Sequence, residues 1–173
     1  MSELYLLRHS RTAPHSDTRP DRERPLEEQG RADARALARW IAARRLRPDL
    51  VLCSPARRAR ETQDLIVEAF ATPPELRYDN ELYLADADRL LDELRTLPEG
   101  VGRVMLVGHN PGLHELAQML SDATTGPLAR RLADNLPTSG LAMFEIATGW
   151  PGLKRRGAHL EALVTPRDLG RRG

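Results

Sequence analysis

Two arginines and two histidines of this sequence lie at or shortly after the ends of short apolar runs: Arg8, His9, Arg58 and His109. The planar guanidinium of arginine suits phosphate, and a histidine with one ring nitrogen hydrogen-bonded can attack phosphorus through the other. Catalysis of phosphoryl transfer relies mainly on such positioning and on fixed positive charge. The four residues therefore predict a site for phosphoryl transfer, with His9 as the nucleophile and His109 as a second donor to the phosphoryl group.

Arg58 follows Ser54-Pro55, a pair typical of a helix start, with serine as the N-cap and proline as the first helical residue. The free N–H groups and the dipole of a first helical turn attract anions, so this location favours phosphate binding by Arg58. Thr62 lies one turn later on the same face and is expected to brace Arg58. The neighbouring Arg57 and Arg60 are interpreted as solvated charges.

Strand-like and helix-like segments alternate along the chain. Short apolar runs predict strands at residues 4–10, 49–53, 75–78, 103–107, 141–146 and 159–164. Helical periodicity is found from residue 28 to before Pro48, over 56–70, around 90–97, from Pro111 (capped by Asn110) and over 128–136. This alternation predicts an α/β fold, namely one three-layer α/β/α domain with a mostly parallel central sheet and helices on both faces. Because ligands bind beyond the carboxyl ends of such strands, Arg8-His9, Ser54-Pro55 and His109-Asn110 are expected to converge there.

The length of 173 residues suits one domain, which we expect over residues 1–166, with a frayed tail over 167–173. The net charge is only +1, which gives no general attraction for nucleic acid or an anionic membrane. Apolar runs are strand-sized and the N-terminus lacks a signal-peptide pattern, so we expect a cytoplasmic protein. The residues say nothing about the oligomeric state.

Other phosphate and nucleotide chemistries match the sequence poorly. Cys53, the single cysteine, has Ala59 where a cysteine phosphatase needs arginine. No nucleotide-triphosphate loop is found, since Lys154 is the sole lysine, and no dinucleotide-binding glycine motif follows the first strand. Metal-assisted hydrolysis with His9 and His109 stays open, although no third ligand stands out.

Three motifs in order resemble the histidine phosphatase superfamily, also called phosphoglycerate mutase-like, and within it the SixA-like phosphohistidine phosphatases. They are Leu-Leu-Arg-His-Ser at 6–10, Ser-Pro-Ala-Arg-Arg-Ala-Arg-Glu-Thr at 54–62 and Val-Gly-His-Asn-Pro-Gly at 107–112. The resemblance extends over nearly the whole chain, including Arg24-Pro25-Leu26 with Gly30 and the segment 136–140. It implies that His9 is phosphorylated, that Arg8, Arg58 and His109 form the phosphate pocket, and that no metal or other cofactor takes part.

The sequence departs from the family pattern at Ser10, where glycine is usual, and we expect the nucleophile to tolerate this change. The family's general acid is commonly a glutamate, and Glu81 is the nearest match, with Asp17 as a second candidate. The arginines of the early loop, Arg19, Arg22 and Arg24, are open to contact with either substrate or solvent.

The expected substrate is a phosphohistidine on another protein, because the short chain has no insertion that would roof the pocket. A small phosphomonoester, such as a sugar or nucleotide phosphate, is the alternative. A mutase is less favoured, because it would need a closed site. A phosphate-binding module without catalysis also remains open.

Overall fold

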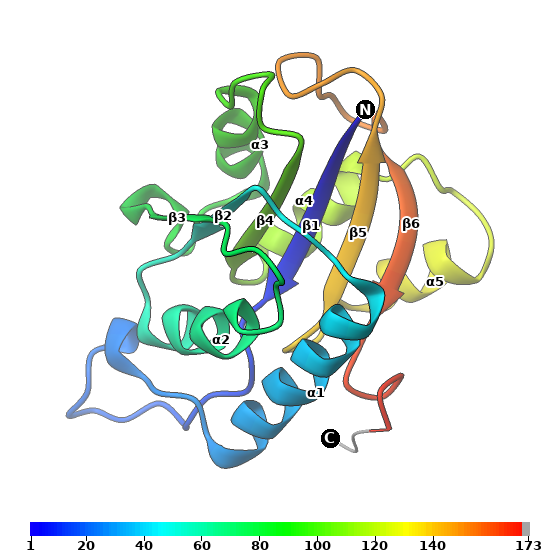
Figure 1. Ribbon diagram of the computed structural model, residues 1–173. Helices are drawn as coiled ribbons and strands as arrows, with labels where there is room; N and C mark the ends of the chain where they lie inside the picture. Colours follow the sequence, from blue (N-terminus) through cyan, green and yellow to red (C-terminus); the bar gives the residue numbers. More distant parts are fainter. Residues whose placement is uncertain (171–173) are drawn as a thin grey trace.

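A computed structural model describes residues 1–170 and has a six-stranded central sheet (Figure 1). The strand order is β3-β2-β4-β1-β5-β6. β1 and β4 pair in parallel, β2 pairs in parallel with β4 and β3, and β5 runs antiparallel to β1 and β6. The strands are β1 (Ser2–Arg8), β2 (Leu50–Cys53), β3 (Glu75–Tyr78), β4 (Arg103–Gly108), β5 (Leu141–Ile146) and β6 (His159–Val164). The predicted mostly parallel sheet is confirmed.

Helices cover both faces of this sheet (Figure 1). On one face lie α1 (Glu28–Arg44) and α2 (Arg57–Val67), and on the other α3 (Ala87–Arg95), α4 (Gly112–Leu120) and α5 (Pro127–Asp134). Successive side chains of a strand point to opposite faces, so Leu4 and Leu6 of β1 pack under α3 and α4, whereas Tyr5 and Leu7 pack under α1. The three-layer α/β/α architecture is therefore confirmed.

The two predicted helix caps are wrong, because the Ser54 and Asn110 side chains make other contacts. α2 begins at Arg57 and α4 at Gly112, so Ser54-Pro55 and Asn110 lie in the turns before the helices. The Ser54 hydroxyl accepts a bond from the N–H of Ala56 at 3.3 Å and also contacts His109, while the amide of Asn110 reaches the Leu136 carbonyl. These side chains thus bind across strand ends instead of capping a helix.

The loop over residues 11–27 is pinned at several points. It contains the short helix η1 (Asp21–Glu23) and an isolated bridge between Thr12 and Leu26. The N–H of Leu26 also donates to the Glu61 carboxylate of α2 at 2.7 Å. The loop is thereby held beside the end of β1.

The chain after β6 differs from the expected frayed tail as far as it is described. Residues 167–170 form a turn in which the Asp168 carboxylate accepts bonds from Arg131 of α5, at 2.5 Å, and from the N–H of Thr165. Leu169 packs against the core beneath α1. The last residues of the predicted tail, 171–173, lie outside the described part. Within residues 1–170, no helix is long and apolar enough to cross a membrane.

Candidate active site

The strand ends carrying the predicted site residues meet at one edge of the sheet. In the parallel register, Arg8 of β1 pairs with Gly108 of β4, and Cys53 of β2 pairs with Val107. His9, Ser54 and His109 therefore follow three adjacent strands, with β4 in the middle. A cavity of about 420 Å³ lies at this edge, which we call the phosphate cavity; it is lined by Arg8, His9, Arg11, Thr12, Asp21, Arg24, Arg58, Leu84, His109, Asn110 and Thr138.

The imidazole of His9 is held in one tautomer. Its Nδ1 lies 2.8 Å from the carbonyl oxygen of Ser10, which can only accept, so the ring proton is on Nδ1 and Nε2 keeps its lone pair. Burial lowers the pKa of His9 to about 3; the Ser10 bond opposes this shift and the charges of Arg58 and Arg8 add to it. The ring is therefore neutral near pH 7, with Nε2 available as a nucleophile.

His109 is held in the same tautomer as His9. The Ser54 hydroxyl, which accepts from the N–H of Ala56, can donate its own proton to Nε2 of His109, 2.6 Å away. The ring proton of His109 is then on Nδ1, which has no partner within the described residues. Burial lowers the pKa of His109 to about 3, with the charge of Arg58 adding to the shift. The rings of His9 and His109 lie with their centroids 5.2 Å apart.

Two arginines of the phosphate cavity, Arg8 and Arg58, each keep a free donor. Arg8 donates from Nη1 to the Leu136 carbonyl, and Arg58 donates from both Nη atoms to Asp21, while the Nε of each has no partner in the described chain. Burial lowers the pKa of Arg8 from its very high usual value. Together with Nδ1 of His109, the cavity residues thus carry three buried donors that lack an acceptor, an arrangement suited to the oxygens of a phosphoryl group.

Asp21 is a site residue that the sequence interpretation did not identify. Its carboxylate accepts bonds from Arg58 at 3.0 Å, from Arg24 at 2.9 Å and from the hydroxyl of Tyr83. Burial on its own would raise the pKa of Asp21, but the Tyr83 bond and the charge of Arg58 outweigh it and lower the pKa to about 2. The spacing of Asp21 and Arg24, three residues apart in a loop near the first strand end, is the signal that could have indicated this pair.

Tyr83 connects this loop to the rest of the site. Its ring lies edge-on to His109 with the centroids 5.6 Å apart, and the guanidinium of Arg22 stacks over it at 4.9 Å. Of the three loop arginines that the sequence left open, Arg24 lines the cavity, Arg22 contacts Tyr83 and Asn80, and Arg19 does not line it. The contacts of Tyr83 hold the early loop against the edge of the cavity.

Thr62 contacts the backbone of Arg58, whereas Asp21 holds the guanidinium. Its hydroxyl donates to the carbonyl of Arg58 at 2.7 Å and accepts from the N–H of Ser10 at 2.9 Å. The hydroxyl of Ser10 pairs with that of Ser139. Thr62 thus ties the first turn of α2, which carries Arg58, to the residue after His9.

Neither predicted proton donor lines the phosphate cavity. The carboxylate of Glu81, in the short helix η2 (Asn80–Leu82), pairs with Arg89 at 3.0 Å, and its side chain is 61% exposed. Asp17 is exposed in the early loop. Among residues 1–170, no three His, Cys, Asp or Glu side chains gather as a metal site.

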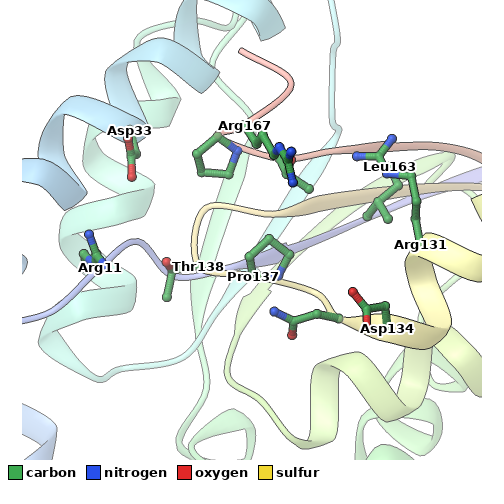
Figure 2. A pocket seen from close by; sticks show the side chains of 11 residues that line it. Arg11, Asp33, Arg131, Asp134, Pro137, Thr138, Leu163 and Arg167 are labelled. Atoms are coloured by element: carbon green, nitrogen blue, oxygen red, sulfur yellow. The ribbon is translucent and has the colours of Figure 1, made fainter. Parts of the chain in front are cut away.

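A second cavity adjoins the first and shares Arg11 and Thr138 with it (Figure 2). This adjoining cavity has a volume of about 520 Å³ and lies between α1, α5 and the segment after β6. Arg11 pairs with Glu27 and Arg131 with Asp168, whereas Arg167 makes no ion pair within the described residues. The edge of the sheet therefore offers a hollow that extends beyond the space for a phosphoryl group.

Comparisons with known proteins identify the family of this chain. The model of the histidine phosphatase superfamily (branch 1) matches residues 4–83. An uncharacterized protein of Mycobacterium tuberculosis, Rv1276c, is 32% identical over 163 residues, which cover 93% of this chain and 100% of the relative. Phosphohistidine phosphatase SixA of Escherichia coli is 28% identical over 132 residues, covering 73% of this chain and 78% of the relative.

A solved structure from Agrobacterium tumefaciens, provisionally assigned as phosphohistidine phosphatase SixA, superposes with a TM-score of 0.80 at 34% identity. The match covers 95% of this chain and 98% of the other. Similarity over the full length, together with strand-end motifs that meet at one cavity, shows that this chain is a phosphatase of the histidine phosphatase superfamily.

Proposed function

We propose that the protein hydrolyses phosphohistidine on another protein through a phosphoryl group carried transiently on His9. The observation that carries this proposal is the neutral His9, with Nε2 unprotonated, in a cavity whose residues hold three buried donors without acceptors. Such donors stabilise the charge of a phosphoryl group in transfer without having to reorganise. A general phosphate-binding module would not need a histidine held in this tautomer.

In the first step, the lone pair on Nε2 of His9 attacks phosphorus and the bond from phosphorus to the substrate breaks. The proton on Nδ1 stays in its bond to the Ser10 carbonyl, so the phosphorylated ring is cationic and the carbonyl stabilises that charge. Arg8, Arg58 and His109 hold the phosphoryl oxygens. In the second step water attacks phosphorus, the electron pair of the P–N bond returns to Nε2, and phosphate leaves.

The states of the acidic residues at and near the cavity favour a nitrogen leaving group, which needs no proton from the protein. An alkoxide needs a proton as it leaves, yet Asp21 is ionised with a pKa of about 2, and Glu81 points to Arg89. A phosphohistidine that is protonated on its second ring nitrogen needs no such acid, since the electron pair of the breaking P–N bond yields neutral imidazole. The scarcity of acids at this site thus supports phosphohistidine over a phosphomonoester.

The adjoining cavity supports a macromolecular substrate. It continues from the phosphate cavity through Arg11 and Thr138, so a protein that presents a phosphohistidine there can also contact Arg131 and Arg167 (Figure 2). A small sugar or nucleotide phosphate is too small to contact both cavities as fully as a protein can. The printed name of the E. coli relative, phosphohistidine phosphatase, agrees with this choice.

The test is the intact mass of the protein, quenched without acid after brief exposure to a phosphohistidine-bearing protein or to 4-nitrophenyl phosphate. We expect a transient phosphoryl adduct on the wild type, formed faster from the phosphohistidine donor, and none on His9→Ala. Faster turnover of a small phosphomonoester would reverse the choice of substrate. Full activity of His9→Ala would overturn the covalent mechanism, and no turnover of any donor would indicate a binding module.

A further inference from the structure

The residues of the phosphate cavity include one buried acceptor that lacks a donor. Besides the three donors described above, Oδ1 of Asn110 is the remaining buried side-chain polar atom without a partner within residues 1–170. Asn110 lines the phosphate cavity directly after His109. A buried carbonyl oxygen without a hydrogen bond costs free energy and calls for an explanation, and a bound ligand is one.

The orientation of the Asn110 amide follows from its other end. Nδ2 donates to the carbonyl of Leu136 at 2.8 Å, and a carbonyl can only accept, so the amide cannot be rotated without losing this bond. The same Leu136 carbonyl accepts a bond from Nη1 of Arg8 at 3.2 Å. Asn110 therefore keeps Oδ1 as an acceptor, held on the same anchor as a phosphate-binding arginine.

A phosphoryl group does not pair with this oxygen. Its non-bridging oxygens carry negative charge and accept hydrogen bonds, which the Nε atoms of Arg8 and Arg58 and Nδ1 of His109 can supply. An acceptor beside these donors needs a ligand atom that carries a proton. On a phosphohistidine that atom is the second ring nitrogen, which bears a proton in the form whose imidazole leaves neutral.

We propose that Oδ1 of Asn110 accepts a hydrogen bond from the protonated ring nitrogen of the substrate phosphohistidine, which makes Asn110 a specificity-determining residue. The inference rests on the proposed function and deepens it. By binding the N–H, Asn110 selects the protonated ring, so that when Nε2 of His9 attacks, the P–N electron pair passes to a ring that already has its proton. The leaving group then departs as neutral imidazole, with no proton transfer from the protein.

The test compares two small substrates on purified full-length protein. One is free phosphohistidine, and the other is phosphohistidine methylated on the second ring nitrogen, which keeps the positive ring but has no N–H. For the wild type we expect kcat/KM to be roughly tenfold lower for the methylated compound, the effect of one lost hydrogen bond at a buried acceptor. Asn110→Ala should lower kcat/KM for the unmethylated compound and abolish this discrimination.

Asn110→Asp is the matched variant, because it keeps an oxygen acceptor while losing the donor to Leu136. It should retain the discrimination, although its negative charge lowers both rates. If Asn110→Ala still discriminates as the wild type does, the methyl group is excluded for steric reasons or Oδ1 binds only water, and the inference is wrong. An equal loss for both compounds would show that Asn110 merely supports Arg8, which also overturns it.

The proposed function has a separate readout in the same experiment. If the wild type hydrolyses 4-nitrophenyl phosphate but not phosphohistidine, the proposed substrate is wrong, and the role of Asn110 fails with it. If phosphohistidine is the better substrate but the discrimination is absent, only the role of Asn110 fails.

Discussion

Asp21 holds Arg58 by two bonds: its backbone carbonyl accepts from Nη1 at 2.8 Å, and its carboxylate accepts from Nη2 at 3.0 Å. The guanidinium of Arg58 is only 2% exposed, and its Nε stays without a partner among the described residues. Asp21 therefore orients the buried charge and leaves a donor for the ligand. A loop residue with no place in the three recognised motifs sets the position of the phosphate-binding arginine.

Asp21→Asn is expected to lower kcat/KM about tenfold for phosphohistidine and 4-nitrophenyl phosphate alike. The amide keeps a hydrogen-bond acceptor but removes the charge that orients Arg58, so both substrates lose phosphoryl binding equally. Steady-state kinetics with both substrates measures the effect. Asp17→Asn, in the same loop but outside the cavity, is the control, and equal rates for the two variants would show that the ion pair does not position Arg58.

Stability should rise with pH between about 3 and 6.5. The folded pKa values of His9 and His109 are about 3, below the usual value of 6.5, so in this window the unfolded chain binds more protons than the folded chain. Two such protons correspond to a slope of up to about 2.7 kcal/mol per pH unit in the free energy of unfolding. Urea unfolding at several pH values measures the slope, which should level off above about pH 6.5.

His109→Asn isolates one of these protons, because all other titrating groups are shared with the wild type. Its slope should be smaller by up to about 1.4 kcal/mol per pH unit in the same window. Identical slopes for the variant and the wild type would mean that His109 titrates normally in the folded protein.

Glu81→Gln tests the acid that the sequence favoured. Because the Glu81 carboxylate pairs with Arg89 and does not line the phosphate cavity, we expect kcat for a sugar phosphate, whose alkoxide needs a proton as it leaves, to change by less than about twofold. A general acid would instead contribute on the order of a hundredfold or more. Measuring kcat across pH 5–9 separates the two, and loss of the alkaline limb together with a large drop in kcat would restore Glu81 as the proton donor.

Arg167→Glu tests the adjoining cavity as a docking surface. Arg167 makes no ion pair within the described residues, so reversing its charge should leave the fold intact while weakening contact with a substrate protein (Figure 2). We expect kcat/KM for a phosphohistidine protein to fall about threefold to tenfold, and that for free phosphohistidine to stay unchanged. Arg35→Glu, on the exposed side of α1 and outside both cavities, controls for net charge. The docking role is excluded if the two variants act alike on the protein substrate.

The sequence alone determined the layers of the fold and four residues of the site. Apolar runs and helical periodicity are local signals, and β1, β2 and β4 and the helices between them lie close to where those signals predicted them. Parallel strands place their carboxyl ends at one edge, so Arg8, His9, Arg58 and His109 had to lie near one another. The physical reason is that secondary structure and strand direction are largely encoded within short segments.

Only the tertiary structure decided which groups contact these four residues, and which tautomers and pKa values the histidines have. Asp21 contacts Arg58, which lies 37 positions away in the sequence, and Tyr83, which lies 62 positions away. No periodicity within a segment encodes such pairs. The hydrogen bond between His109 and Ser54, which follows another strand, and the ion pair between Glu81 and Arg89 are likewise not encoded within one segment. Burial and charge at the assembled edge lower the histidine pKa values, and neither exists before the strands come together.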